Sequence, residues 1–169
     1  MKAKSARFML LLEENKGILL KVARSYADSK EDRQDLMQEI TFQWWKSFEK
    51  VNGDIKVSTW LYRIALNVAI SCFRKERSMK RWKQEELFKV EEAVSPDSET
   101  DERVELLISF ISTLPPFDKA IMILYLEQKA YKEIAEITGI SLTNVSTRIS
   151  RIKLSLKKKF EMQDGRKIK

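Results

Sequence analysis

The residues with the most evident chemical potential are polar side chains on one segment near the C-terminus. Thr143, Asn144, Thr147, Arg148 and Arg151 recur at helical spacing, with short polar groups first and cations further along. Hydroxyl and amide groups can reach the edges of bases, and arginines can hold phosphates. The pattern predicts a helix that binds DNA. The alternative is an ordinary helical hairpin whose outer face is only solvated.

The residue types that are missing limit the possible chemistry. The chain has no histidine and one cysteine, Cys72, which excludes an internal disulfide, a histidine-based zinc site and a histidine-based catalytic triad. Asp32 and Asp35 could be metal ligands of an enzyme that acts on nucleic acid. Without a phosphate-binding loop or a second acidic cluster this alternative is weak, so we expect no enzymatic activity, no metal and no cofactor.

Composition favours a helical protein with a polyanionic partner. The 169 residues are 43% hydrophobic and 34% charged, and the formal net charge is +7. Glycine and proline are scarce, and apolar residues recur at helical spacing through most of the chain, which predicts an all-α fold. No apolar run approaches the ~18 residues of a membrane span, and the N-terminus does not read as a secretory signal. We therefore expect a cytoplasmic protein that does not insert into a membrane.

The segment that precedes the polar helix has the pattern of a short helix and a tight turn. Ile134, Ala135 and Ile137 can form its inner face, Gly139 permits a left-handed turn, and Ser141 can cap the next helix. The apolar side of that next helix is a stripe of Val145, Ile149, Ile152 and Leu156. Two further helices separated by Pro115 and Pro116 complete a helix-turn-helix domain.

Charge divides the chain into two parts. The segment 84–102 contains eight acidic residues and one lysine, and its Ser-Pro-Asp-Ser core breaks helices. Basic residues dominate both flanks, over 74–83 and 148–159. We interpret residues 1–81 as one domain, 82–101 as an acidic linker and 102–169 as a second domain. The alternative is a surface loop within a single bundle.

Three motifs occur in an order typical of one family. DLMQE at 35–39, WLYRIALN at 60–67 and LPP…YKEIAEITGIS at 114–141 together resemble the extracytoplasmic function (ECF) group of bacterial sigma factors, over roughly residues 8 to 160. The resemblance implies that the first domain is region 2 and the second is region 4 of a factor that brings core RNA polymerase to promoters. Region 4 would read the minus-thirty-five element with the polar helix.

The resemblance also implies a polymerase-binding surface on the helix that contains DLMQE. Leu36, Ile40 and Trp44 can form its inner stripe. The outward residues are implied to dock on a coiled coil of the polymerase β′ subunit, and plain solvation is the alternative for each of them. These residues are Asp35, Gln38, Glu39 and Gln43.

Minus-ten recognition is assigned by the same resemblance to the loop 50–58 and the following helix. Asn67 matches the family's asparagine, and an amide can both donate to and accept from a base edge. Trp60, Ile64 and Val68 are predicted to face the core of the domain. The predicted minus-ten contacts are Asn52, Asp54, Arg63, Asn67, Ser71, Arg74, Lys75 and Arg77.

Several alternatives stay open at the level of sequence. A stand-alone helix-turn-helix regulator would bind duplex DNA without polymerase, and a protein that only sequesters a partner would need neither basic block. The acidic linker could imitate RNA phosphates in the polymerase channel, as the family implies, or act as a flexible tether. The family also implies an anti-sigma factor as a partner.

Overall fold

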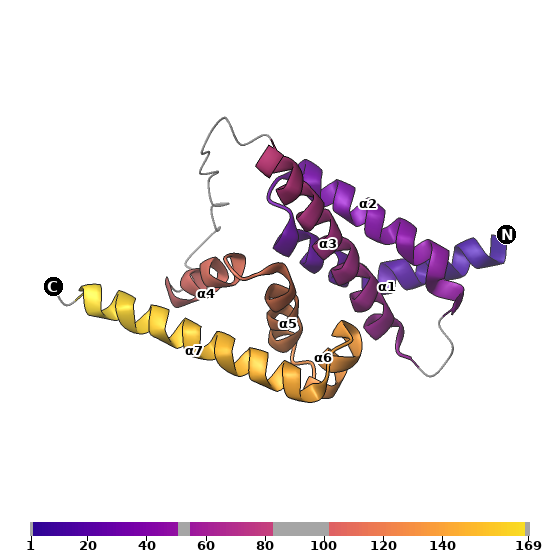
Figure 1. The fold of residues 1–169 in the computed structure, drawn as a ribbon. Helices are drawn as coiled ribbons and strands as arrows, with labels where there is room; N and C mark the ends of the chain where they lie inside the picture. The colour runs from indigo at the N-terminus through magenta and orange to yellow at the C-terminus, as the bar shows by residue number, and fades with distance from the viewer. Residues whose placement is uncertain (1, 51–54, 83–101, 168–169) are drawn as a thin grey trace. The chain divides into compact units, whose positions relative to one another are not determined.

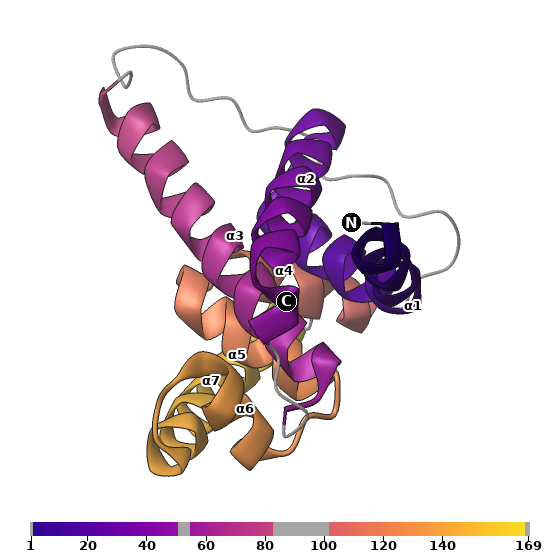
Figure 2. The ribbon, with the colours of Figure 1, turned by 90° about the vertical axis from the view of Figure 1, so that its right-hand side faces the viewer.

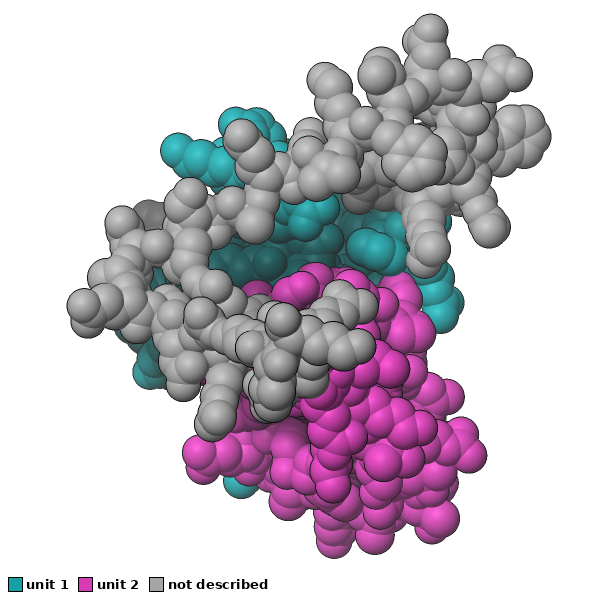
Figure 3. Space-filling model, turned by 90° about the vertical axis from the view of Figure 1, so that its left-hand side faces the viewer, with its two compact units in different colours: residues 1–82 teal, residues 83–169 magenta. Residues whose placement is uncertain are grey.

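The computed structural model describes residues 2–50, 55–82 and 102–167, and all regular structure in these ranges is helical. The all-α prediction is confirmed. The chain divides into two compact units, residues 1–82 (unit 1) and 83–169 (unit 2), coloured separately in Figure 3. The acidic segment interpreted as a linker lies outside the described residues, apart from Trp82 at its start. Within the described ranges, no helix has both the length and the apolar composition that crossing a membrane requires.

The described residues of unit 1 form a bundle of three α-helices in which each helix packs against the other two (Figures 1 and 2). The helices are α1 (Lys2–Tyr26), α2 (Lys30–Ser47) and α3 (Val57–Trp82), and a 3₁₀ turn at Phe48–Lys50 follows α2. Ser29 caps α2, since its hydroxyl accepts a hydrogen bond from the Asp32 backbone N–H at 3.0 Å.

The predicted inner stripe of α2 is confirmed. Leu36, Ile40 and Trp44 are all buried, and Ile40 and Trp44 have no exposed surface. The Trp44 ring meets the ring of Phe8 edge to face, with centroids 5.1 Å apart. Full burial of such large side chains contributes about 1.5–3 kcal/mol each, which fixes the rotation of α2 about its own axis.

The predicted inner face of α3 is wrong by one position. Trp60, Ile64 and Val68 are only partly buried, and they lie on the flank of the helix that lines a groove. The reason is that α3 packs against both α1 and α2, and the alanines at its centre allow this close double contact. Among the described side chains of α3, the buried ones are Thr59, Leu61, Tyr62, Ala65, Leu66 and Ala69.

Unit 2 consists of α4 (Glu102–Ser112), α5 (Pro116–Leu126), α6 (Tyr131–Thr138) and the long α7 (Leu142–Lys167), all visible in Figure 1. The central helix α5 is buried from Lys119 to Leu124. After α5, Gln128 adopts a left-handed conformation with φ of 56°. The Gln128 N–H bonds to the Tyr125 carbonyl at 3.0 Å and the Lys129 N–H to that of Leu124 at 3.1 Å, which is the Schellman pattern.

The turn between α6 and α7 has the predicted geometry. Gly139 is left-handed with φ of 75°, and the Ser141 hydroxyl accepts from the Asn144 backbone N–H at 3.2 Å. On α6, Ile134 and Ile137 are buried, and Ala135 is partly buried. On α7, Val145, Ile149 and Ile152 are buried and Leu156 packs partly buried against a cluster of Phe110, Met122 and Ile152. The structure therefore confirms the helix-turn-helix.

Candidate nucleic-acid interface

One face of α7 presents the polar residues that the sequence singled out. Thr143, Asn144, Thr147 and Arg151 are exposed, and the stripe on the opposite side of the helix is buried. Gly139 and Ser141 set where α7 begins, so the first of these side chains lie in its first two turns. The structure thus brings these four residues together on one accessible surface.

Arg148, the fifth predicted residue of this surface, is engaged within unit 2. Its Nη1 lies 2.6 Å from Oδ1 of Asp118 on α5, and its Nε donates to Oδ1 of Asn144 at 3.0 Å. The guanidinium also lies over the ring of Phe117, 5.3 Å from the centroid. Sequence reasoning treated Arg148 as a phosphate contact and did not identify Asp118, because residues 30 positions apart carry no periodic signal.

Two lysines further along α7 contact aromatic rings of the same unit. Lys153 donates to the Tyr125 hydroxyl at 2.5 Å and lies over its ring, and Lys159 lies 4.9 Å from the centroid of Phe110. This hydrogen bond to the Tyr125 hydroxyl raises the pKa of Lys153 above its usual value. Both lysines remain exposed, so their charges stay accessible to a phosphate backbone.

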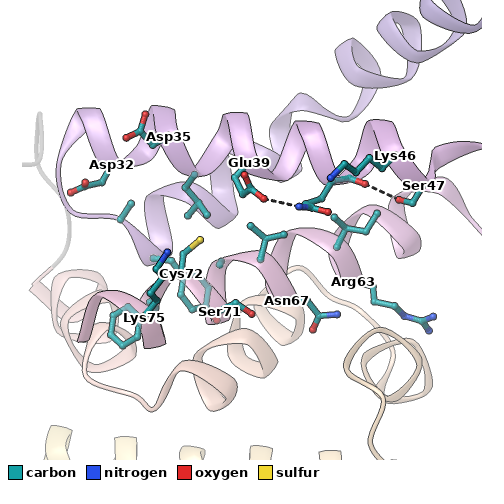
Figure 4. Close-up of a pocket in the computed structure, with 18 of the residues that line it drawn as sticks. Asp32, Asp35, Glu39, Lys46, Ser47, Arg63, Asn67, Ser71, Cys72 and Lys75 are labelled. Atoms are coloured by element: carbon teal, nitrogen blue, oxygen red, sulfur yellow. Dashed lines mark hydrogen bonds between the residues drawn. The ribbon is translucent and has the colours of Figure 1, made fainter. Parts of the chain in front are cut away.

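In unit 1 a groove runs between α2 and α3 and is lined by polar groups from both (Figure 4). The α2 wall carries three carboxylates, those of Asp32, Asp35 and Glu39, and one cation, Lys46. Gln43 donates to Glu39 Oε1 at 2.7 Å. The α3 wall carries cations and uncharged polar groups. The predicted minus-ten residues on this wall are Arg63, Asn67, Ser71 and Lys75.

The other predicted site residues of unit 1 do not all line this groove. Arg74 is exposed on α3 beyond the groove lining. Asn52 and Asp54 lie outside the described residues, and so does the side chain of Arg77. Among the predicted polymerase contacts, Asp35, Glu39 and Gln43 share the groove, but Gln38 does not.

Gln38 belongs to a second, apolar surface that the sequence interpretation missed. Phe42 and Trp45 are 49% and 36% exposed there, beside Met37 and Thr41. Trp45 packs on the rings of Phe8 and Phe48, so one edge of it is fixed in the core. A usable signal was present, because Gln38 and Phe42 are four residues apart and Trp45 follows three later, which is the spacing of one helix face.

The alternative of a metal-dependent enzyme rests on Asp32 and Asp35. Both carboxylates are exposed on the α2 wall, and Asp32 is hydrogen bonded to the Ser29 hydroxyl at 2.6 Å. No group of three or more metal-ligating side chains gathers among the residues that the structure describes.

Comparison with protein families identifies the family of the chain. A family model described as Sigma-70 region 2 matches residues 11–79, and one described as Sigma-70, region 4 matches residues 105–156. The chain belongs to the sigma-70 family, within its ECF group. The two matches fall on unit 1 and unit 2 respectively, so the sigma factor carries its groove in region 2 and its helix-turn-helix in region 4.

Individual relatives agree with this assignment. The RNA polymerase sigma factor SigV of Bacillus subtilis is 29% identical over 147 residues, covering 86% of this sigma factor and 86% of SigV. The sigma factor YlaC of the same organism is 28% identical over 136 residues, covering 76% of this chain and 77% of YlaC.

Two solved structures share the fold. The sigma factor RpoE of Bartonella quintana, solved in complex with the anti-sigma factor NepR, matches with a TM-score of 0.72 at 20% identity, covering 95% of this chain and 98% of RpoE. CnrH, solved in complex with the cytosolic domain of CnrY, matches with a TM-score of 0.67 at 19% identity, covering 94% and 90%.

Proposed function

We propose that the two units of this sigma factor contact separate promoter elements, with unit 2 reading the minus-thirty-five duplex and unit 1 holding the melted minus-ten strand. As a member of the sigma-70 family, the chain binds core RNA polymerase and directs promoter-specific transcription initiation. The chain supplies recognition surfaces in the cytoplasm, while the polymerase performs the chemistry, so no catalytic residue or cofactor of its own is involved.

The observation that carries the minus-thirty-five assignment is the two-sided character of α7. A helix with a buried stripe and an exposed row of short polar groups and cations fits the major groove, where base edges are distinguishable. Thr143, Asn144 and Thr147 lie in the early turns that reach bases. Arg151 follows one turn later, at the position of a phosphate contact.

Minus-ten recognition is assigned to the exposed side of α3. Asn67 and Ser71 are one turn apart and exposed, and Arg74 and Lys75 continue the same side. A melted strand offers unpaired base edges to the amide, and its phosphates attract the cations. Arg63, whose guanidinium lies 5.7 Å from the centroid of the Trp60 ring, is a further proposed contact on this helix. Asn52 and Asp54, which lie outside the described residues, complete the proposed minus-ten contacts.

The binding of core polymerase is assigned to the exposed side chains of α2. Asp35 and Glu39 supply negative charge and Gln43 an amide, which suits orientation against a basic partner such as the β′ coiled coil. Gln38 lies on the adjoining apolar surface with Phe42 and Trp45. A charged wall beside exposed aromatic rings matches the composition of protein interfaces, in which aromatics contribute much of the binding energy.

Run-off transcription with purified core polymerase tests the whole proposal. Core enzyme with the full-length chain is expected to initiate at specific members of a promoter library, and core enzyme alone is not. Arg74→Ala is expected to weaken all promoters alike, since phosphate contacts carry no sequence information. Asn67→Ala is expected to weaken them according to their minus-ten sequence.

Two controls separate the alternatives. Glu161→Gln, an exposed change on α7 away from all the proposed contacts, is expected to behave as wild type. If the chain neither binds nor redirects core polymerase but protects intact duplex DNA, the stand-alone regulator replaces this proposal.

An anti-sigma factor is the further partner we propose. Support comes from RpoE, which was solved with the anti-sigma factor NepR. Crosslinked purification of the full-length chain from its host, followed by adding each recovered protein to the run-off assay, tests this. A recovered protein that abolishes initiation at an equimolar ratio supports the proposal, and inhibition by none of them contradicts it.

A further inference from the structure

A chain of hydrogen bonds links a predicted base-reading residue to a different helix of unit 2. Asn144 on α7 accepts from Arg148 Nε at 3.0 Å, and Arg148 Nη1 lies 2.6 Å from Asp118 Oδ1 on α5. The side chains of Arg148 and Asp118 are 37% and 23% exposed, so this contact is partly shielded from water. Phe117, next to Asp118, supports the guanidinium from its ring face at 5.3 Å.

The chemistry of the guanidinium determines which way the Asn144 amide points. Arginine has five N–H donors and no acceptor, so its partner atom on Asn144 is the carbonyl oxygen and not the NH₂ group. The Arg148–Asp118 pair holds that guanidinium from the other side. Asn144 is exposed, and with its oxygen engaged it presents mainly the two N–H donors of its NH₂ group to a ligand.

We infer that Asn144 reads DNA as a hydrogen-bond donor and therefore selects a guanine edge over an adenine edge, with Arg148 and Asp118 as positioning residues that set this preference. The inference rests on the proposed reading of duplex DNA by α7. Adenine is recognised by an amide through an acceptor and a donor together, since it presents both N7 and N6–H₂ in the major groove. Guanine presents two acceptors, N7 and O6, and suits a group that mainly donates.

Arg148 acquires a different role from that of a phosphate contact. Its charge is balanced by Asp118, and two of its N–H groups are already engaged. Arg151, exposed one turn further along α7, remains the proposed phosphate contact. The two arginines therefore form a matched pair, in which one governs base preference and the other governs affinity.

The test uses holoenzyme assembled from core polymerase and the full-length chain, with a library in which the upstream promoter duplex is randomised. Run-off transcripts are sequenced to give a preference at each base pair. Asn144→Ala identifies the base pair in question, because it removes the preference there and nowhere else. At that base pair we expect wild type to favour guanine over adenine by about five-fold or more, the lower end of discrimination by a specific base contact.

Variants of the positioning residues give the decisive comparison. Arg148→Met frees the Asn144 oxygen, so the guanine-to-adenine ratio is expected to fall to about one or to reverse. Asp118→Ala, on a helix that does not carry the base-reading row, is expected to lower the ratio at least two-fold, and Asp118→Asn restores it because an amide oxygen still accepts from Arg148. Arg151→Met is the matched control and lowers transcription from all sequences without changing the ratio.

The outcomes separate the inference from the function on which it rests. A ratio that collapses in Arg148→Met and Asp118→Ala and recovers in Asp118→Asn supports the inference. A wild-type preference for adenine, or a ratio unchanged by these variants, overturns it while leaving duplex reading intact. A merely structural role is recognised by equal losses at every sequence. If wild-type holoenzyme shows no upstream preference at all, the proposed function of α7 fails first. If Arg148→Met does not fold, the guanine-to-adenine ratios of Asp118→Ala and Asp118→Asn test the inference by themselves.

Discussion

Replacing Gly139 with alanine should weaken unit 2 through backbone strain alone. Gly139 has a φ of 75°, and a Cβ built there meets no atom within 4 Å, so a steric clash contributes nothing. A left-handed conformation costs an L-residue about 1–2 kcal/mol. Alanine also restricts the unfolded chain, which offsets about 0.4–1 kcal/mol of that cost. The free energy of unfolding should therefore fall by about 1 kcal/mol, or about 4–8 °C in Tm for a domain of this size.

Gln128 offers the reciprocal experiment in the same unit. Gln128 is left-handed with φ of 56°, yet it has a Cβ. Gln128→Gly should therefore relieve at this position the same kind of backbone strain that Gly139→Ala creates at position 139. The Schellman bonds after α5 use backbone atoms and survive the substitution. We expect the free energy of unfolding to rise by about 0.5–1 kcal/mol, once the greater conformational freedom of glycine in the unfolded chain is subtracted.

Gly17 provides an internal control in the other unit. It lies within α1, and nothing stands within 4 Å of the position that a Cβ would take, so Gly17→Ala should stabilise unit 1 by about the helix propensity difference of 1 kcal/mol. All four tryptophans lie in unit 1, at 44, 45, 60 and 82, so tryptophan fluorescence reports on that unit.

Urea unfolding followed by both circular dichroism and tryptophan fluorescence measures the three variants. Gly17→Ala should raise the fluorescence midpoint, and the two substitutions in unit 2 should move the dichroism signal in opposite directions. A neutral or stabilising effect of Gly139→Ala would show that the left-handed turn is not occupied in solution.

Three further predictions concern unit 1. Ile40→Ala should lower the free energy of unfolding by about 2–5 kcal/mol, because the side chain is fully buried. Phe42→Ala should lower it by less than about 1 kcal/mol, because Phe42 is half exposed. The midpoints of urea unfolding distinguish the two variants. Burial raises the pKa of Tyr26 above its ordinary value near 10, so the folded state keeps a proton that the unfolded chain loses. The free energy of unfolding is therefore unaffected by this group below about pH 10, and above it falls by up to about 1.4 kcal/mol per pH unit. Tyr26→Phe should remove this contribution to the pH dependence. Urea unfolding curves recorded between pH 8 and 11 measure it. Arg74→Ala should lower by about 0.7 the slope of log affinity against log salt for single-stranded DNA bound by holoenzyme, and an unchanged slope would exclude a phosphate contact.

Local rules accounted for the helix-turn-helix because its geometry depends on neighbours in sequence. Gly139 and Ser141 act within a few residues, and the stripe of Val145, Ile149 and Ile152 follows from helix period alone. The inner stripe of α2 was predictable for the same reason. The left-handed turn at Gln128 was not, because glutamine gives no residue-type signal for a positive φ.

The prediction of the buried face of α3 was wrong because periodicity gives the spacing of an apolar stripe but not its width. A helix packed against one neighbour buries one row, and Trp60, Ile64 and Val68 are a valid row at that spacing. Packing against both α1 and α2 instead buries two adjacent rows, headed by Leu61 and Tyr62. Trp60, Ile64 and Val68 then lie at the edge of the buried surface of α3, where they line the groove together with Asn67.

That displacement bears on function as well as on packing. A base held by Asn67 would lie beside partly exposed apolar side chains rather than against a wholly polar helix surface. Ile64 and Val68 flank Asn67 at three positions before it and one after it, so they can shield the amide hydrogen bonds from water, which strengthens them. Ile64→Ala should therefore weaken minus-ten recognition without removing any polar contact, and its effect should depend on the base at the position read by Asn67. If Ile64→Ala lowers run-off transcription equally for every minus-ten sequence, the residue acts through folding alone and this role for the groove edge is wrong.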